Sequence, residues 1–313
     1  MVENYREPLI VLKSEREEMI ETLHPPITFK AKSWLLQFTP FSHQCRNTNN
    51  CIIGNGIGKS GTYFLNRIIE CLDHWENIKV HILPHGWMFT KLLQVQDDFV
   101  FHKCVPQYSV KKLRNGQFVA AHLPWDKKLE QVIENTKPMR RIKHILMYRD
   151  PRDTFVSYMR FVISPTYYWS PKARARHDFV KNNFSNDDDR LTYIIQKRIK
   201  NPRCDFSRYE PWLKSSNCCT ISFEELLTEF LDKLATKENQ FGNVLKKIFD
   251  YLEVDVSTID PINFYRCVYG KSITASEEKN KIGQYKRYFK EHHYKMLDNP
   301  EFRKILDVFG YEW

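Results

Sequence analysis

A glycine-rich turn between an apolar run and an amphipathic segment is the feature that most constrains the fold of this chain. The turn is Gly58-Lys59-Ser60-Gly61-Thr62, which follows the apolar residues 51–53 and precedes apolar positions at helical spacing over residues 64–72. This order predicts a short buried strand, a tight turn and a helix with one apolar face. Backbone N–H groups and the positive end of the helix dipole then converge on one point, where an anion such as a phosphate is expected to bind.

The side chains of this turn also suit an anion. Ser60 and Thr62 add hydroxyl donors, Lys59 adds a full positive charge, and the glycines let the main chain approach a ligand closely. The Walker A loop of nucleotide kinases requires a glycine five residues before its Gly-Lys-Ser/Thr. Ile53 occupies that position here, which weakens the kinase assignment. An ordinary strand-to-helix turn with a solvated Lys59 stays open as the alternative.

A second strand-to-helix junction lies further along the chain. An apolar run over residues 144–148 leads into Arg149-Asp150-Pro151-Arg152-Asp153 and then into apolar positions at helical spacing. Asp150 suits the N-cap and Pro151 the first helical position, while the Asp153 carboxylate is expected to bond back to the N–H of the cap. Arg149 can bind a phosphate with two hydrogen bonds, and Ser157 can donate from the same side. A well-capped helix with surface arginines is the alternative.

Two anion sites at the carboxyl ends of predicted strands indicate a nucleotide with two separated phosphate groups. At these residues the chain resembles the sulfotransferase family, specifically its cytosolic or bacterial type, whose members use 3′-phosphoadenylyl sulfate. The matching segments follow the family's order over about residues 51–310. They are Lys59-Ser60-Gly61-Thr62 for the 5′-phosphosulfate loop, His122-Leu123-Pro124 for the catalytic histidine, Arg149 through Ser157 to Phe161 for the 3′-phosphate segment, Ile221 to Leu226 for a late strand and helix, and Lys279 to Phe289 for a loop that closes over the nucleotide.

The resemblance implies a role for each matching residue. His122 would accept a proton from the acceptor, and Lys59 would neutralise charge on the departing diphosphate. Phe64 would stack on the adenine, with Phe223 as a second candidate near the base. The donor, 3′-phosphoadenylyl sulfate, is the implied cofactor, and the chemistry needs no metal. The implied phosphate contacts are Lys59, Ser60, Gly61, Thr62 and Tyr63 for the 5′-phosphate, and Arg149, Ser157 and Lys279 for the 3′-phosphate.

Three departures from the family pattern limit what the resemblance carries. Tyr63 stands where the family usually has a second threonine. Ala120 and Ala121 stand where cytosolic members often have Lys-Thr before the histidine, so no second lysine is expected from that strand. Glu278-Lys279-Asn280 replaces the family's late Arg-Lys-Gly, which leaves Lys279 as the expected 3′-phosphate contact and places an acidic side chain beside it.

Predicted strands alternate with predicted helices along the chain. The strands are residues 51–53, 119–121, 143–148 and 218–221, and the clearest helices are 223–234, 244–252 and 302–309. This alternation predicts an α/β protein with a three-layer, P-loop-like fold, in which helices flank a central parallel sheet and the ligand lies beyond the strands' carboxyl ends. Residues 51–313 are expected to form the sulfotransferase domain, and residues 1–50 an N-terminal extension that packs on it.

Composition bears on the expected partners of the chain and on its expected cellular compartment. The net charge of +10 is spread along the chain and forms no basic block, so no nucleic-acid partner is expected. A small-molecule or carbohydrate acceptor is expected instead. Aromatic and basic residues of segments 84–112 and 164–184 either line the acceptor pocket or pack in the core. Eight cysteines without a Cys-x-x-Cys pair favour a reduced, cytoplasmic setting. No apolar run is long enough for a signal peptide or a membrane span, and the oligomeric state is open.

No metal site is expected. His81 and His85 have helical spacing, but Pro84 lies between them, and His292-His293 is expected on an exposed helix face. Two rival functions stay open beside the sulfotransferase: a P-loop kinase that uses ATP and magnesium, and a nucleotide-binding protein without turnover. The kinase leaves Arg149 and Ser157 without a role.

Overall fold

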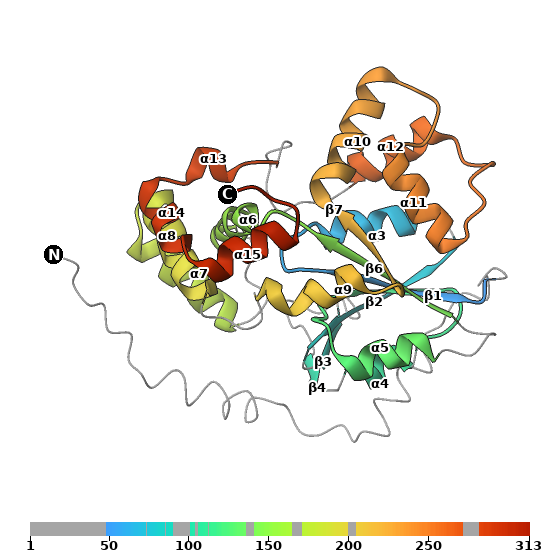
Figure 1. Ribbon diagram of the computed structural model, residues 1–313, viewed down its shortest axis with the longest axis horizontal. Coiled ribbons are helices and arrows are strands. Elements are labelled where there is room, and N and C mark those ends of the chain that lie inside the picture. The colour runs from blue at the N-terminus through green and yellow to red at the C-terminus, as the bar shows by residue number, and fades with distance from the viewer. Residues whose placement is uncertain are drawn as a thin grey trace. The chain divides into compact units, whose positions relative to one another are not determined.

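The computed structural model describes residues 48–72, 74–84, 86–89, 101–103, 106–111, 113–135, 141–164, 171–199, 205–271 and 282–313 (Figure 1). Residues 1–47 of the expected N-terminal extension lie outside the described residues, and so does Lys279. The same holds for the aromatic side chains of segment 84–112 and for Tyr167, Tyr168 and Trp169 of segment 164–184. The interpretation of these aromatic residues therefore stays a prediction.

A seven-stranded sheet lies at the centre of the described chain, in the order β4-β3-β2-β5-β1-β6-β7. Its strands are β1 Asn50–Gly56, β2 Glu76–Leu83, β3 Gly86–Phe89, β4 Phe101–Lys103, β5 Gln117–Ala121, β6 Arg141–Tyr148 and β7 Cys218–Ser222. The five strands β2, β5, β1, β6 and β7 are parallel, which confirms the predicted central sheet. Strands β3 and β4 extend one edge in antiparallel pairing. They have four and three residues, too few to show a periodic pattern in the sequence.

Parallel pairing brings the carboxyl ends of four strands to one edge of the sheet. Asn55 of β1 pairs with Ala121 of β5, and Gly56 pairs with Met147 of β6. All seven residues of β1 and all five of β5 are buried, as expected for strands covered on both faces. The turns that follow β1, β5, β6 and β7 therefore meet at this edge, where open α/β sheets bind their ligands.

Helices cover both faces of the sheet. The helices of the described residues are α3 Thr62–Cys71, α4 Pro106–Lys111, α5 Lys127–Glu134, α6 Pro151–Ile163, α7 Pro171–Asn183, α8 Asp187–Ile199, α9 Glu210–Lys214, α10 Phe223–Thr236, α11 Asn243–Leu252, α12 Pro261–Lys271, α13 Tyr285–Tyr288, α14 Glu291–Leu297 and α15 Pro300–Val308. Helices α3, α10, α11 and α12 share one apolar cluster with the sheet, and α4 and α5 lie on the opposite face (Figure 1). This arrangement confirms the predicted three layers.

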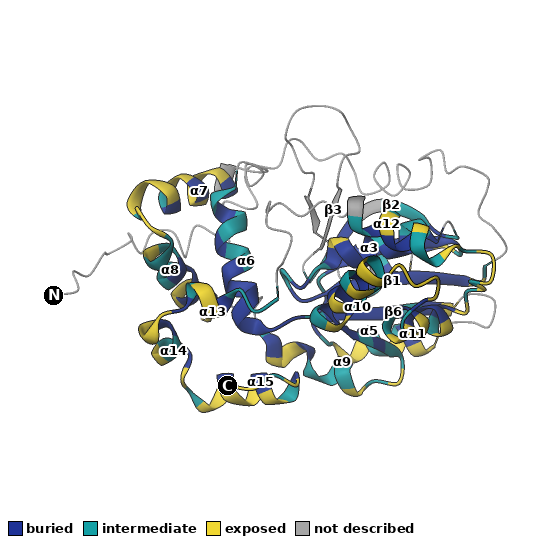
Figure 2. Ribbon diagram, turned by 90° about the horizontal axis from the view of Figure 1, so that it is seen from above, coloured by how far each residue is buried: buried dark blue, intermediate teal, exposed yellow. Residues whose placement is uncertain are grey.

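A second apolar cluster joins α6, α7 and α8 to the C-terminal helices α13, α14 and α15. Figure 2 shows β1 buried along its length, whereas α7 and α14 expose their outer sides. Within the described residues, no helix combines the length and apolar character needed to cross a membrane. None of the five cysteines in that part of the chain forms a disulfide, and the cytoplasmic setting stays a prediction.

The start of α6 confirms part of the predicted capping. Asp150 is the N-cap, where its Oδ1 accepts the N–H of Arg152 at 2.8 Å, and Pro151 is the first helical residue. The predicted bond from Asp153 back to the cap is wrong. The N–H of Asp150 instead donates to Glu224 Oε1 at 3.1 Å. Because α10 supplies this acceptor from a distant part of the sequence, local spacing could not reveal it.

Candidate active site

Residues 57–61, which we call the phosphate loop after the ligand predicted for them, follow β1 and are hydrogen-bonded to the end of β6. The N–H of Ile57 donates to the carbonyl of Met147 at 3.2 Å, and Ser60 Oγ donates to the same carbonyl at 2.7 Å. The N–H of Ser60 donates to the Ile57 carbonyl at 2.9 Å. Both donors of Ser60 are thus used inside the protein, so this residue shapes the loop. Lys59 adopts a left-handed φ of 73°, which is strained for lysine and which these contacts hold in place.

The first turn of α3 carries polar groups that lack partners. Gly61 is the N-cap, and the N–H groups of Thr62 and Tyr63 begin the helix, where no intrahelical acceptor exists. Thr62 Oγ1 is buried and has no hydrogen-bond partner among the described residues, while Tyr63 is 63% exposed. Because buried polar groups normally have partners, an unsatisfied hydroxyl beside unsatisfied helical N–H groups fits an anionic ligand.

Gly61→Ala is expected to destabilise the fold by more than left-handed strain alone. Gly61 has φ 94°, and a Cβ built on it lies 2.5 Å from Phe223 Cδ2. Strain contributes about 1–2 kcal/mol, and overpacking against the ring adds about 1–3 kcal/mol. Urea unfolding of Gly310→Ala supplies the control, since Gly310 has φ 77° and open space around its Cβ position. Equal losses in the two variants would contradict the proposed clash with Phe223.

His122 follows β5, and one hydrogen bond fixes its tautomer. Its Nδ1 lies 2.5 Å from the carbonyl oxygen of Gly56. A carbonyl oxygen only accepts, so Nδ1 carries the proton and Nε2 keeps its lone pair. Burial lowers the pKa of His122, the bond to Gly56 raises it, and the nearby charges of Lys59 and Arg198 lower it further. The imidazole is therefore a neutral base at physiological pH.

Asn55 positions the turn that carries His122. Its Nδ2 donates to the carbonyl of Leu123 and its Oδ1 accepts the N–H of Leu123, both at 2.8 Å. The same Nδ2 lies 3.0 Å from Nε2 of the buried His144, whose pKa burial lowers to about 3, so that His144 accepts as a neutral ring. Trp212 Nε1 donates to the same Leu123 carbonyl at 3.1 Å. No motif indicated Asn55, because it lies beyond the predicted strand 51–53 and only the structure extends β1 to Gly56.

Arg149 joins the end of β6 to the late loop. It is 3% exposed, and its guanidinium lies over the ring of Phe223 at 4.6 Å from the centroid. Its Nη2 lies 3.1 Å from Asp153 Oδ2. The Asp153 carboxylate also accepts the N–H groups of Gly283 and Tyr285, both at 2.8 Å. The Asp153 carboxylate, held by Arg149, thus fixes residues 283–285 within the segment that resembles the family's nucleotide-closing loop.

Other residues predicted at the 3′-phosphate are described only in part. Ser157 lies half-buried on α6, and Lys279 lies outside the described residues. Arg152 belongs to the same junction, but it forms a two-bond pair with Asp150 and lies over the ring of Tyr285 at 4.1 Å. Its charge is therefore neutralised within the protein.

Comparison with protein families decides the class of this site. Residues 52–299 match the family model described as "Sulfotransferase domain", a range that includes the phosphate loop, His122 and Arg149. This chain belongs to the sulfotransferase family. It is a transferase enzyme, and the assignment rules out the kinase interpretation of the glycine-rich turn. Comparison with curated protein sequences gives no match.

Solved structures with a similar fold are distant from this sulfotransferase in sequence. The crystal structure of mouse sulfotransferase SULT7A1 complexed with PAP has 16% identity and a TM-score of 0.46, over 84% of this chain and 89% of that one. Two retinol dehydratase structures, one with androsterone and inactive cofactor PAP and one with retinol and PAP, each have 12% identity and a TM-score of 0.47, over 83% of this chain and 80% of theirs. Residue roles in the present sulfotransferase therefore rest on its own geometry.

The two aromatic residues expected near the adenine lie in the core of this sulfotransferase. Phe64 is 4% exposed and lies edge-on to Phe230, with 4.8 Å between ring centroids. Phe223 is 5% exposed and is covered by Gly61 and Arg149. Both rings thus pack within the protein, and their stacking on an adenine stays a prediction. An apolar residue at helical spacing looks the same in sequence whether it faces the core or a ligand, so only the tertiary structure separates the two roles.

Arg198 of α8 is a residue of this site that no motif indicated. Its Nη2 lies 3.8 Å from the position of a Cβ built on Gly58, and its charge acts on His122. The contact spans a large separation in sequence, so local patterns carry no signal for it.

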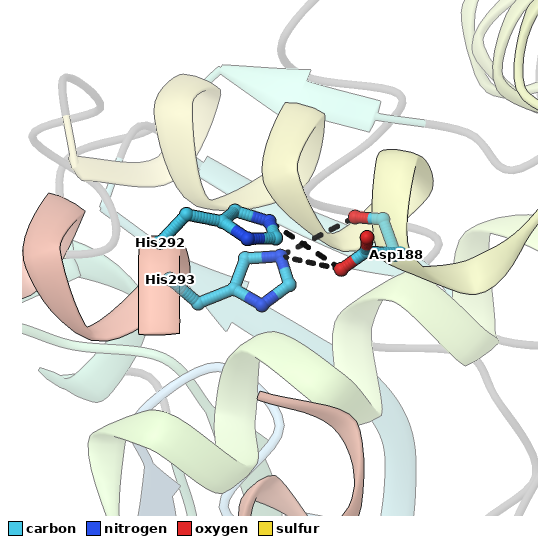
Figure 3. Close-up of side chains that lie close together, drawn as sticks. All are labelled: Asp188, His292 and His293. Atoms are coloured by element: carbon cyan, nitrogen blue, oxygen red, sulfur yellow. Dashed lines mark hydrogen bonds and ion pairs between the residues drawn. The ribbon is translucent and has the colours of Figure 1, made fainter. Parts of the chain in front are cut away.

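Asp188, His292 and His293 form a cluster of possible metal ligands in the described part of the chain (Figure 3). His293 is fully buried, so the expectation of an exposed helix face is wrong for it. Its Nδ1 accepts the N–H of Lys290 at 3.0 Å, so Nε2 carries the proton and donates to Thr192 Oγ1 at 2.9 Å. Lys290 Nζ lies 2.9 Å from Asp188 Oδ2. A protonated nitrogen and an ammonium group suit a contact between α8 and α14 better than a cation site.

Proposed function

We propose that this sulfotransferase moves a sulfuryl group from 3′-phosphoadenylyl sulfate to a hydroxyl or amine of a small-molecule or carbohydrate acceptor. Family membership supports the reaction class. The observation that carries the proposal is the meeting, at one edge of the sheet, of an unsatisfied helix N-terminus, Lys59 and the neutral imidazole of His122. An anionic donor and a proton-bearing acceptor are the two reactants that such groups can bind together.

The proposed transfer balances with these groups. The acceptor oxygen or nitrogen forms a bond to sulfur while the bond between sulfur and the bridging oxygen of the donor breaks. His122 Nε2 takes the acceptor's proton. The product 3′,5′-ADP leaves with the new negative charge on its 5′-phosphate. Lys59 and the N–H groups of Thr62 and Tyr63 stabilise that charge, because fixed donors in a site of low polarity act strongly on charge that develops in the transition state.

Binding of 3′,5′-ADP against 5′-ADP tests the donor assignment. Calorimetric titration of the wild-type chain is expected to give at least about tenfold tighter binding of 3′,5′-ADP, since charge-assisted hydrogen bonds to a phosphate contribute about 1.5–3 kcal/mol. Ser157→Ala is expected to reduce this preference by roughly fivefold, as a lost neutral donor contributes about 1 kcal/mol. The exposed Ser257→Ala serves as the control.

Equal affinity for the two nucleotides would contradict the assignment of a 3′-phosphate site. Transfer from labelled donor to phenols, carbohydrates and amines then identifies the acceptor class. Absence of transfer to every class, together with tight 3′,5′-ADP binding, would favour the nucleotide-binding protein without turnover.

A further inference from the structure

Arg198 is a buried cation beside the phosphate loop. It lies in the last turn of α8 and is 6% exposed. Its guanidinium packs over the ring of Tyr158 of α6, 4.3 Å from the centroid. Its Nη2 atom lies 3.8 Å from the position of a Cβ built on Gly58, the residue before Lys59. Arg198 thus lies on the α6 side of the same loop that carries the predicted phosphate contacts.

The charge of Arg198 has no anionic partner within the described ranges of the chain. None of the carboxylates there lies within ion-pair distance of it, and its Nε is buried without a hydrogen-bond partner. Arg149 and Arg152 are equally buried, but each of them forms an ion pair. Removing a charge from water costs several kcal/mol unless a partner compensates for it. An unpaired guanidinium at a ligand site therefore implies an anion that arrives with the ligand.

Helix α6 places Arg198 close to Lys59. Tyr158 and Phe161 lie three residues apart, so they share one face of the helix. Lys59 Nζ lies over the Phe161 ring at 3.9 Å, as Arg198 lies over Tyr158. Both cations also act on His122. The two charges and the imidazole therefore surround one volume at the carboxyl edge of the sheet.

We propose that Arg198 contacts the sulfuryl group of the donor and acts with Lys59 as the second cation of the transfer site. This inference rests on the proposed function. A guanidinium offers donors in a planar fork that matches two oxygens of a tetrahedral anion. Its presence also explains how the site functions with Ala120 in place of a second lysine on β5. Arg198 moves no proton, because it stays charged throughout the transfer.

Arg198→Met tests this role through the difference between donor and product. The kcat for sulfuryl transfer is expected to fall about 10²–10³-fold, as for loss of one transition-state donor. The Kd for 3′,5′-ADP is expected to stay within about twofold, because the product lacks the sulfuryl group that Arg198 contacts. Lys197→Met, the exposed neighbour on the same helix, is the control and is expected to leave both quantities unchanged.

A pH profile separates this role from a structural one. The groups that face His122 are His81, whose ring lies 4.5 Å away, the Gly56 carbonyl, Lys59 and Arg198. Loss of a positive charge beside His122 makes its protonation easier. The acid limb of kcat/KM is therefore expected to move to higher pH in Arg198→Met, and to stay in place in Arg198→Lys.

Arg198→Lys also carries the test if Arg198→Met does not fold. It keeps the buried charge but lacks the planar fork, so kcat is expected to fall at least about tenfold with unchanged 3′,5′-ADP affinity. Unchanged kcat in a folded variant would overturn the inference, and so would a parallel loss of 3′,5′-ADP affinity, which would assign Arg198 to the 5′-phosphate. Failure of the wild-type chain to transfer from 3′-phosphoadenylyl sulfate would instead overturn the proposed function.

Discussion

Lys59→Met is expected to lower kcat for sulfuryl transfer by about 10²–10³-fold. In the proposed transfer, the ammonium group of Lys59, which lies over the Phe161 ring, stabilises the negative charge that develops as the sulfur–oxygen bond of the donor breaks. Methionine keeps an apolar stem over the Phe161 ring and occupies the same backbone conformation, so the loop is expected to keep its shape. Initial rates with labelled 3′-phosphoadenylyl sulfate measure the effect.

The matched control for this variant is Lys214→Met. Lys214 is exposed, pairs with Glu210 and precedes the amino end of β7, at the opposite edge of the sheet. Its replacement is expected to change kcat by less than about twofold, since surface pairs contribute little. A similar change of kcat in the two variants would contradict the proposed role of Lys59 in the transfer step.

His122→Gln is expected to lower kcat/KM by about 10²–10⁴-fold. Glutamine can still donate to the Gly56 carbonyl, but it offers no basic nitrogen for the acceptor's proton. The wild-type profile is expected to lose activity as pH falls through a value below 6.5, because burial and the neighbouring cations lower the pKa of His122 and only the neutral ring accepts a proton. This acid limb is expected to disappear in the variant.

His177→Gln supplies the control for that experiment. His177 is also buried, and its Nδ1 lies 2.8 Å from the carbonyl of Val162, but it belongs to α7 and faces none of the proposed reactants. Thermal unfolding compares the stability of the two variants. Wild-type rates in a folded His122→Gln would place the base elsewhere, with His81 as the nearest candidate.

Local signals in the sequence predicted much of the fold. Strands β1, β5, β6 and β7 are buried runs, and the caps of α6 stand directly after β6, so each element can be predicted from a short window. The phosphate loop is predictable for the same reason. Its glycines, lysine and hydroxyls act within a few residues of one another, and the helix that follows supplies the dipole. Strand β2, residues Glu76–Leu83, was not among the predicted strands. The antiparallel edge formed by β3 and β4 also escaped prediction, because its strands are short.

The roles of individual side chains were less predictable. Ser60 was expected to hold a phosphate, and both its donors are used within the loop and on β6. Asp153 was expected to cap α6, and it instead accepts two N–H groups of the late loop. In each case the observed partner of the side chain comes from a distant part of the chain, and the pattern of a single segment does not contain that partner.

The sequence by itself determined the class of this protein: a strand, a glycine-rich turn and a helix, followed in order by a histidine and an arginine junction at strand ends. Those features depend on neighbours in the chain, so local chemistry is enough to predict them. Only the tertiary structure decided which tautomer His122 adopts, that Asn55 positions its turn, and that Arg198 brings an unpaired charge to the same volume. These properties arise where strand ends and helices meet across large separations in sequence, and no pattern within one segment records such contacts.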